Sequence, residues 1–380
     1  MWALRNGVFS IWPTHDYCMK ESPIERQNTV RKNDRRNNGL ELARAFAAGA
    51  VVYGHLVGES LHSKDLSMWA GPTPSPLLSP ALNFIWWPQQ FFAQVTQGSH
   101  FTVIGVALFF LITGWLTPDM MKRGSRWEYL GNRFFRIYPA LIGTTLLCAL
   151  IQYVMSANIA LSTTSILGTM TTIYREVNLT PINAVVWTLA IEVRFYLLSF
   201  VMGNWTPTRL LVAILGLLGL FGLGWLFGWP SLCQDVSFIL FILVGMSLRL
   251  WVKDKVRFNL WLIILALMAC NFVYWLHGHY RPIQLLSIPS QVVSLGLFLG
   301  FLCCSRWIGD WVKTIAAPTY SLYLLHCMIG FPVLALARPL TGEIAALGLA
   351  LLSCVLGSVL SHRYFEKPFY RSLKSTVIEL

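Results

Sequence analysis

The feature that most constrains this fold is a series of apolar runs, each long enough to cross a membrane. A helix needs about 20 apolar residues to span a hydrocarbon core of about 30 Å. Ten runs of this kind occur, at approximately 39–58, 98–117, 137–156, 184–203, 209–227, 236–251, 258–276, 289–304, 315–336 and 343–362. Only 12% of the residues are charged, which argues against a soluble domain. The sequence predicts an all-α polytopic membrane protein with about ten transmembrane helices.

Positive charge is unevenly divided between the two sides of these predicted helices. When the loops are assigned alternately, one side carries 23 of the 29 Lys and Arg residues and the other carries 4. Because cytoplasmic loops are enriched in Lys and Arg, we expect both termini in the cytoplasm and a multi-pass protein of the inner (cytoplasmic) membrane. Topology and anionic lipid headgroups explain the net charge of +12. We expect no nucleic-acid partner, since no basic stripe is interleaved with exposed aromatic residues.

The chain divides into three predicted regions. Residues 1–38 are polar and lack the apolar stretch of a signal peptide, so we expect a largely disordered cytoplasmic extension. Residues 39–365 form the predicted membrane domain, and 366–380 a cytoplasmic tail. We therefore expect the membrane domain and its loops to carry any chemistry. The first external loop, about 59–97, contains the aromatic segment NFIWWPQQFF, which suits either a membrane-interface anchor or part of an acceptor groove.

Ionisable side chains inside the predicted helices are the candidates for function. Each costs about 2.5–3.5 kcal/mol at the bilayer centre and needs a partner or a water-filled cavity. They are Glu41, Arg44, His55, Glu192, Arg194 and His326. Arg44 and His55 are eleven residues apart, so they share a helix face and lie about 16 Å apart along the axis. A single membrane histidine is commonly a packed, hydrogen-bonded residue, so position alone leaves the role of His55 open.

The stretch WTLAIEVRFYLL, residues 187–198, places two charges in one apolar helix. Glu192 and Arg194 are two residues apart, about 200° around a helix, so each needs its own partner. Glu192 could orient a histidine on a neighbouring helix, as a carboxylate does for a general base. Alternatively, hydrogen bonds to Trp187, Tyr196 or another helix could bury it. We expect Arg194 in the cytoplasmic half, where it would snorkel to the interface or meet an anionic ligand.

The predicted cytoplasmic loop KRGSRWEYLGNRFFRIYP supplies candidates for binding a phosphorylated donor. Arg126, Arg133 and Arg136 lie in it, and the last two would share a face if the segment were helical. Guanidinium groups suit phosphate oxygens, although the positive charge could equally reflect topology. The eight cysteines are scattered without metal-ligand spacing, so we expect no metal.

Six segments together resemble the acyltransferase-3 family, in order and in spacing, over nearly all of the chain from about residue 39. They are LELARAFAAGAVVYGH (40–55), LFFLITG (108–114), RFFRIYP (133–139), WTLAIEVRFYLL (187–198), SLYLLH (321–326) and FEKPF (365–369). Family members are integral-membrane enzymes that O-acylate cell-surface carbohydrates, some lipids and small molecules. The resemblance implies a cytoplasmic acyl coenzyme A donor, commonly acetyl, and an acceptor on the far side of the membrane.

The resemblance also implies roles for particular residues. It makes Arg44 and His55 an essential pair with His55 as the catalytic residue, and it implies functional roles for Arg133, Arg136 and Glu192. The sequence departs from the common family pattern at a few positions: Glu41 replaces Asp, Thr113 replaces Ser, Val193 and Arg194 replace a second acid and Gln, and Lys367 replaces Arg. Arg194 is the departure that leaves donor or acceptor specificity open.

These expectations combine into a hypothesis of O-acetyl transfer from acetyl coenzyme A to a cell-envelope carbohydrate. His55, oriented by Glu192, would act as a general base or as a transient acyl carrier. The donor would be held by Arg44, Arg126, Arg133 and Arg136. We expect supporting contacts from Tyr138, Trp187, Tyr196, Ser321 and His326. The acceptor stays open between lipopolysaccharide O-antigen, another polymeric or lipid-linked glycan, and a secondary metabolite. A multi-helix transporter or a lipid-linked carrier is the alternative function.

Overall fold

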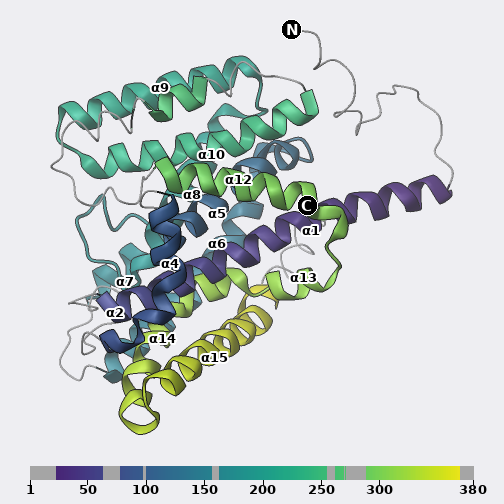
Figure 1. The fold of residues 1–380 in the computed structure, drawn as a ribbon. Helices are drawn as coiled ribbons and strands as arrows, with labels where there is room; N and C mark the ends of the chain where they lie inside the picture. Colours follow the sequence, from purple (N-terminus) through teal and green to yellow (C-terminus); the bar gives the residue numbers. More distant parts are fainter. Residues whose placement is uncertain are drawn as a thin grey trace.

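The computed structural model describes residues 23–62, 78–96, 100–155, 162–254, 262–268, 270 and 288–368. Every regular element within these ranges is a helix (Figure 1). Nine helices in them are long and apolar enough to cross a membrane, and they correspond to nine of the ten predicted runs. The remaining run, 258–276, lies largely outside the described residues, although 262–268 are helical. The prediction of an all-α polytopic membrane protein is therefore confirmed.

The spanning helices and their extensions have the following bounds. They are α1 (Pro23–Tyr53) with η1 (Gly54–Glu59) and α2 (Ser60–His62), α5 (Phe101–Met121), α6 (Arg126–Met155), η3 (Ala184–Val186) with α8 (Trp187–Met202), α9 (Pro207–Leu226), α10 (Pro230–Asp254), α12 (Ile288–Cys304) with η5 (Ser305–Trp307), α14 (Thr319–Thr341), and α15 (Glu343–Ser361) with η6 (His362–Glu366). The shorter elements are η2 (Pro80–Leu82), α4 (Asn83–Val95), α7 (Thr163–Thr171) and α13 (Trp311–Ala316).

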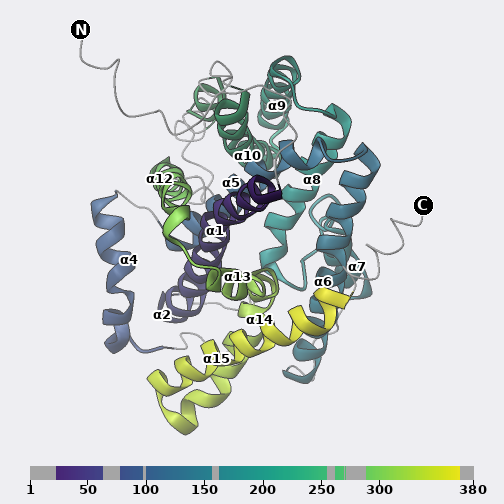
Figure 2. The same ribbon diagram turned by 90° about the vertical axis from the view of Figure 1, so that its right-hand side faces the viewer.

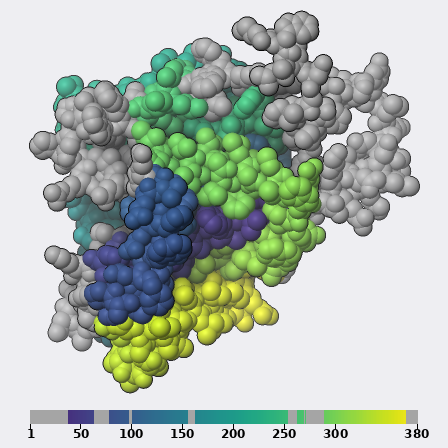
Figure 3. Space-filling view, in the orientation of Figure 1, coloured from purple at the N-terminus to yellow at the C-terminus, as the bar shows by residue number. Residues whose placement is uncertain are grey.

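Helix α1 is the central element of the bundle. It contacts α5, α12, α13 and α14, which surround it in the view of Figure 2. In the space-filling view, part of α1 is visible in a hollow between α12 and the last two spans, beside α4 (Figure 3). The helix begins at Pro23, a residue suited to the first helical position, so its backbone extends upstream of the predicted span. Residues 1–22 of the expected extension lie outside the described residues.

The predicted cytoplasmic loop before the third span is mostly helical, which corrects the sequence interpretation. Helix α6 starts at Arg126 because Ser125 and Glu128 form a reciprocal cap. The Ser125 amide donates to Glu128 Oε2 at 2.8 Å, and the Glu128 amide donates to Ser125 Oγ at 3.1 Å. This is the capping box expected of an S-x-x-E pattern. Arg133 and Arg136 therefore lie on a rigid helix.

Helices α5 and α10 cross at very close range. An added Cβ at Gly114 would lie 1.9 Å from the carbonyl oxygen of Ile242, and one at Gly245 would lie 2.3 Å from that of Leu111. Small residues allow such backbone approach between membrane helices, where close packing drives association. This crossing fixes α5, and with it the neighbouring side chain of Thr113, at the centre of the bundle.

A π-helix, η1, interrupts the regular backbone at the C-terminal end of α1, and His55 lies within it. π-helical turns are rare and occur frequently at functional sites. Helix α4 packs over this segment. Trp86 stacks on Tyr53 with ring centroids 5.2 Å apart, and a Cβ at Gly58 would come within 2.6 Å of the Trp86 ring. Trp87 is 59% exposed, so the two tryptophans of the aromatic segment have different environments.

Candidate active site

The structure pairs two histidines from opposite ends of the sequence. His55 Nδ1 lies 2.8 Å from His326 Nε2, although the residues are 271 positions apart. The two rings are nearly parallel, at 10° with centroids 5.1 Å apart. His55 is 6% exposed and His326 is fully buried. No sequence pattern links these residues, and the contact between α14 and η1 brings them together.

Hydrogen bonding defines the proton positions in this pair. His326 Nδ1 lies 2.8 Å from the carbonyl oxygen of Tyr323, which can only accept, so His326 Nδ1 carries the proton. In a neutral ring, His326 Nε2 is then an acceptor. His55 must donate from Nδ1, and the lone pair of neutral His55 is on Nε2. The geometry thus selects the tautomer in which His55 Nε2 is the basic atom.

Glu192 has different partners from the one expected. Its carboxylate accepts a hydrogen bond from Thr113 Oγ1 at 2.7 Å and a longer one from the Tyr196 hydroxyl at 3.4 Å. His326, not Glu192, lies beside Nδ1 of His55. The arrangement matches the alternative in which hydrogen bonds to Tyr196 and to another helix hold the carboxylate.

Three of the four predicted donor-binding arginines gather near one another. Arg44 pairs with Glu41 at 2.7 Å and lies within electrostatic range of Arg133 and Arg136. We call Arg44, Arg133 and Arg136 the arginine cluster. Arg126 hydrogen-bonds the carbonyl oxygen of Val201 at 3.4 Å and lies at the start of α6, seven residues before Arg133.

Arg133 is the most buried member of the arginine cluster, at 2% exposure. Its guanidinium carbon lies 4.9 Å from the Tyr196 ring centroid and 5.6 Å from that of Tyr129, and one terminal nitrogen contacts Met120 Sδ. Its Nε–H has no hydrogen-bond partner within the described part of the chain. Because an unpaired buried donor costs about 1–3 kcal/mol, this N–H is suited to an acceptor on a bound ligand.

The arginine cluster and the histidine pair are two separate groups of residues that one continuous helical segment connects. Arg44 and His55 are on the same helix, eleven residues apart, which corresponds to about 16 Å. Helix α14 also links the two parts, since it carries His326 and, six residues earlier, Tyr320, which lies within electrostatic range of Glu192 and Arg136. A ligand that contacts both parts must therefore be elongated.

The expected supporting residues lie at several places around this site. Tyr196 adjoins both Glu192 and Arg133, whereas Tyr138 stacks on Phe134 of its own helix and Trp187 packs on Phe238 of α10. The Trp187 contact joins α8 to α10, whereas the Tyr138 contact stays within α6. Ser321 joins a polar group at the end of the last span, described next.

Sequence reasoning missed a polar group around Glu366. Ser321 donates a hydrogen bond to Glu366, and its Oγ lies 2.9 Å from Ser361 Oγ. His362 Nδ1 lies 2.6 Å from Glu366 Oε2. Glu366 lies in the π-helix η6 and within electrostatic range of Tyr320. The sequence predicts that Glu366 begins a cytoplasmic tail. In the structure, its hydrogen bond with Ser321 connects the end of the last span to α14, and the predicted tail boundary stays a prediction.

His55, His326 and Cys327 could in principle hold a metal, since their ligand atoms lie within 4.8 Å of one another. However, two nitrogens bound to one tetrahedral Zn²⁺ at 2.0–2.1 Å would be roughly 3.3 Å apart. The observed separation of 2.8 Å is that of a hydrogen bond. His326 Nδ1 is also committed to a backbone carbonyl. The geometry favours a hydrogen-bonded pair, and the absence of a metal stays a prediction.

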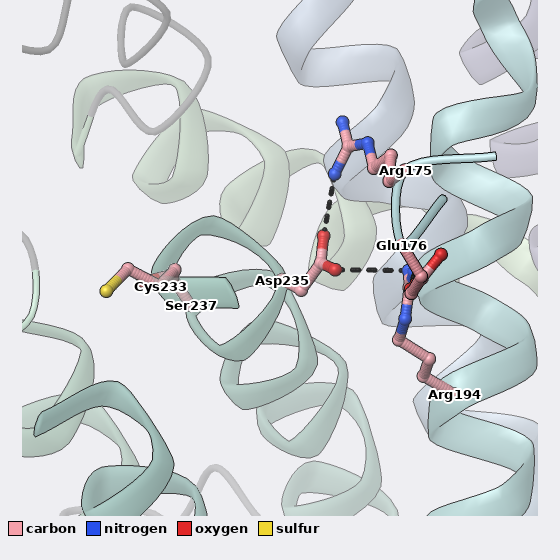
Figure 4. Close-up of polar contacts among 6 residues, drawn as sticks. All are labelled: Arg175, Glu176, Arg194, Cys233, Asp235 and Ser237. Atoms are coloured by element: carbon pink, nitrogen blue, oxygen red, sulfur yellow. Dashed lines mark hydrogen bonds and ion pairs between the residues drawn. The ribbon is translucent and has the colours of Figure 1, made fainter. Parts of the chain in front are cut away.

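Arg194 belongs to a separate network of ion pairs (Figure 4). Asp235 of α10 binds Arg175 at 2.9 Å and Arg194 at 3.1 Å, and Arg194 also pairs with Glu176. Burial raises the pKa of the adjacent Tyr174 phenol, and the charge of Arg175 opposes the rise. Arg194 thus joins α8 to α10 and to the loop before η3. This replaces the expectation of snorkelling or of an anionic ligand.

We expect Asp235→Ala to lower thermal stability strongly, because it leaves Arg175 and Arg194 without their shared carboxylate. Asp235 is 7% exposed, and breaking a buried pair in this way costs roughly 3–5 kcal/mol. Thermal unfolding of the purified protein in detergent would measure the loss. In the control, Glu176→Gln, the altered side chain is 49% exposed and the expected cost is below about 1 kcal/mol. An unchanged melting temperature for Asp235→Ala would contradict a stabilising role.

Comparison with known protein families gives a match over most of the chain. A family model described as an acyltransferase domain (Acyl_transf_3) matches residues 37–363, which is most of the chain. No curated protein and no solved structure matched. The matched range includes both histidines of the pair, all three members of the arginine cluster and Glu192.

Proposed function

The chain belongs to the acyltransferase-3 family, and we propose that this membrane acyltransferase moves an acetyl group from acetyl coenzyme A to a carbohydrate hydroxyl of the cell envelope. One observation carries the proposal. His55 and Arg44, the member of the arginine cluster that lies on α1, are eleven residues apart, about 16 Å along the helix axis, and Arg133 and Arg136 of α6 lie within electrostatic range of Arg44. Coenzyme A has the same two-part design, with phosphates at one end of a long arm and the reactive thioester at the other.

The arginine cluster would hold the donor. The topology predicted from the loop charges has both termini in the cytoplasm, and it puts the starts of α1 and α6, and therefore the cluster, on the cytoplasmic side. Guanidinium groups form strong charge-assisted hydrogen bonds with phosphate oxygens. The buried Nε–H of Arg133 supports this role, since a phosphate oxygen would satisfy it. The thioester arm would extend along α1 towards the histidine pair.

His55 would act as general base in the transfer. Its Nε2 takes the proton of the acceptor hydroxyl while the hydroxyl oxygen bonds to the thioester carbonyl carbon. The carbon–sulfur bond then breaks, and the departing thiolate recovers the proton from Nε2. Each bond made is matched by one broken, and no further reactant is needed. In the alternative course, His55 Nε2 would bond to the thioester carbonyl carbon as the carbon–sulfur bond breaks and the thiolate departs. The hydroxyl oxygen would then bond to the acetyl carbon as the carbon–nitrogen bond breaks, and the hydroxyl proton would pass to the thiolate.

Glu192 is proposed as a member of the donor end of the site. It lies within electrostatic range of Arg133, and it accepts hydrogen bonds from Thr113 and Tyr196. A carboxylate in this position would keep Arg133 oriented without neutralising the whole cluster. The acceptor would approach from the far side of the membrane, where lipid-linked and polymeric glycans are both accessible.

The experiment that tests the function is release of coenzyme A thiol from acetyl coenzyme A by the purified protein, with and without envelope glycans. We expect release that rises when a suitable glycan is added and an acetyl ester on that glycan, detected by mass spectrometry. A protein that binds no acetyl coenzyme A and releases no thiol under any condition would contradict the proposal. That outcome would favour the transporter or carrier alternative.

A further inference from the structure

We infer that His326 is a positioning residue that holds His55 in the tautomer whose Nε2 takes the proton of the acceptor. This inference rests on the proposed function and identifies the group that prepares its base. General bases of this kind usually have a second group that orients the ring through its other nitrogen. Here that group is a neutral imidazole at 2.8 Å, in the place where a carboxylate was expected.

His326 is itself held firmly. Its Nδ1–H donates to the Tyr323 carbonyl oxygen at 2.8 Å, within one turn of α14. The Tyr323 hydroxyl lies 2.7 Å from Thr188 Oγ1 and 3.1 Å from the carbonyl oxygen of Val185, so α8 and η3 anchor this turn. Cys354 of α15 donates to the carbonyl oxygen of His326 at 3.3 Å. Contacts to three other elements therefore fix the acceptor atom that faces His55.

The alternative tautomers are unfavourable at this position. If His326 carried its proton on Nε2, the lone pair of Nδ1 would face the Tyr323 carbonyl oxygen, and two acceptors would lie 2.8 Å apart in a buried site. If His55 carried its proton on Nε2 alone, its Nδ1 and His326 Nε2 would both present lone pairs to each other. Either change loses a buried hydrogen bond, which costs about 1–3 kcal/mol.

The pair also suits the charge that develops during transfer. When His55 Nε2 accepts the hydroxyl proton, the ring becomes an imidazolium and its Nδ1–H becomes a stronger donor. The neutral His326 Nε2 accepts that hydrogen bond before and after the transfer. His326 therefore neither gains nor loses a proton during the transfer. This predicts that another side chain with a fixed acceptor atom can replace His326.

Two substitutions at this position test the inference. His326→Gln retains an acceptor near the place of Nε2 but cannot be protonated, whereas His326→Leu removes the acceptor at similar volume. We expect His326→Leu to lower kcat on the order of 10–100-fold with the KM for acetyl coenzyme A unchanged. We expect His326→Gln to recover most of that loss. Unchanged KM shows that a variant still folds and binds donor.

Three results would overturn the inference. The first is full activity of His326→Leu, and the second is an equal loss of kcat in both His326 variants. The third is a loss of activity in Cys327→Ala together with metal bound to the wild-type protein. The last result would establish metal binding by the neighbouring thiol, whereas unchanged activity of this matched control supports the hydrogen-bonded pair. Wild-type protein without thiol release, or His55→Ala with full release, would instead refute the proposed function, so the two failures are distinguishable.

Discussion

His55→Ala should lower kcat for acyl transfer on the order of 10²–10⁴-fold while acetyl coenzyme A still binds. The expected loss is this large because the substitution removes both the basic Nε2 and the donor to His326. Binding should survive because Arg44, the member of the arginine cluster on α1, lies about 16 Å from His55 along the helix axis. Thiol release measures the first effect, and calorimetric titration with acetyl coenzyme A measures the second.

The matched control for this substitution is His62→Ala. His62 is exposed and lies in α2, the short helix that directly follows η1. Its Nδ1 lies 3.0 Å from the carbonyl oxygen of Gly58. We expect its replacement to leave kcat within about twofold of the wild-type value. Surface substitutions usually change the free energy by no more than about 0.5 kcal/mol. Full activity of His55→Ala in protein that remains folded would remove the catalytic role from this residue. A loss of donor affinity equal to the loss of kcat would move His55 to the donor-binding part of the site.

Arg133→Leu should weaken acetyl coenzyme A binding by roughly 10–100-fold. A hydrogen bond to a charged group contributes about 1.5–3 kcal/mol, and a tenfold change in affinity corresponds to about 1.4 kcal/mol. Arg133→Lys should recover only part of the affinity, because an ammonium group lacks the planar fork and the stacking on Tyr196. Titration calorimetry with acetyl coenzyme A measures both changes.

Arg209→Gln is the control for positive charge on the same side of the membrane. Arg209 is exposed at the start of α9, where it donates to the carbonyl oxygen of Asn204 at 2.9 Å. We expect the donor affinity of this variant to equal that of the wild type. If Arg133→Leu and Arg209→Gln bind acetyl coenzyme A equally well, the arginine cluster would have a topological role only.

Much of the site could be predicted from the sequence because its signals are local. Long apolar runs predict the spans, and the cost of burying charge singles out Arg44, His55 and Glu192 without reference to their neighbours in space. The S-x-x-E pattern at Ser125 also predicts the start of α6 in principle, although the positive charge of that segment favoured a loop. The two-residue spacing of Glu192 and Arg194 correctly predicts that they have different partners.

The partners themselves depend on helix packing. Glu192 was expected beside His55, but the position of α5 gives it Thr113, and the position of α14 gives His55 a second histidine. Asp235 and the loop before η3 similarly decide the environment of Arg194.

The sequence by itself therefore determined which segments can cross the membrane and which side chains are too costly to be incidental, because hydropathy and burial cost depend on short stretches of chain. Only the tertiary structure decided the pairing of His55 with His326, 271 positions away, and thus the tautomer of the base. The physical reason is that a hydrogen bond between helices depends on their relative rotation and depth. Close packing throughout the bundle sets both, as at Gly114 and Gly245, and no local pattern encodes them.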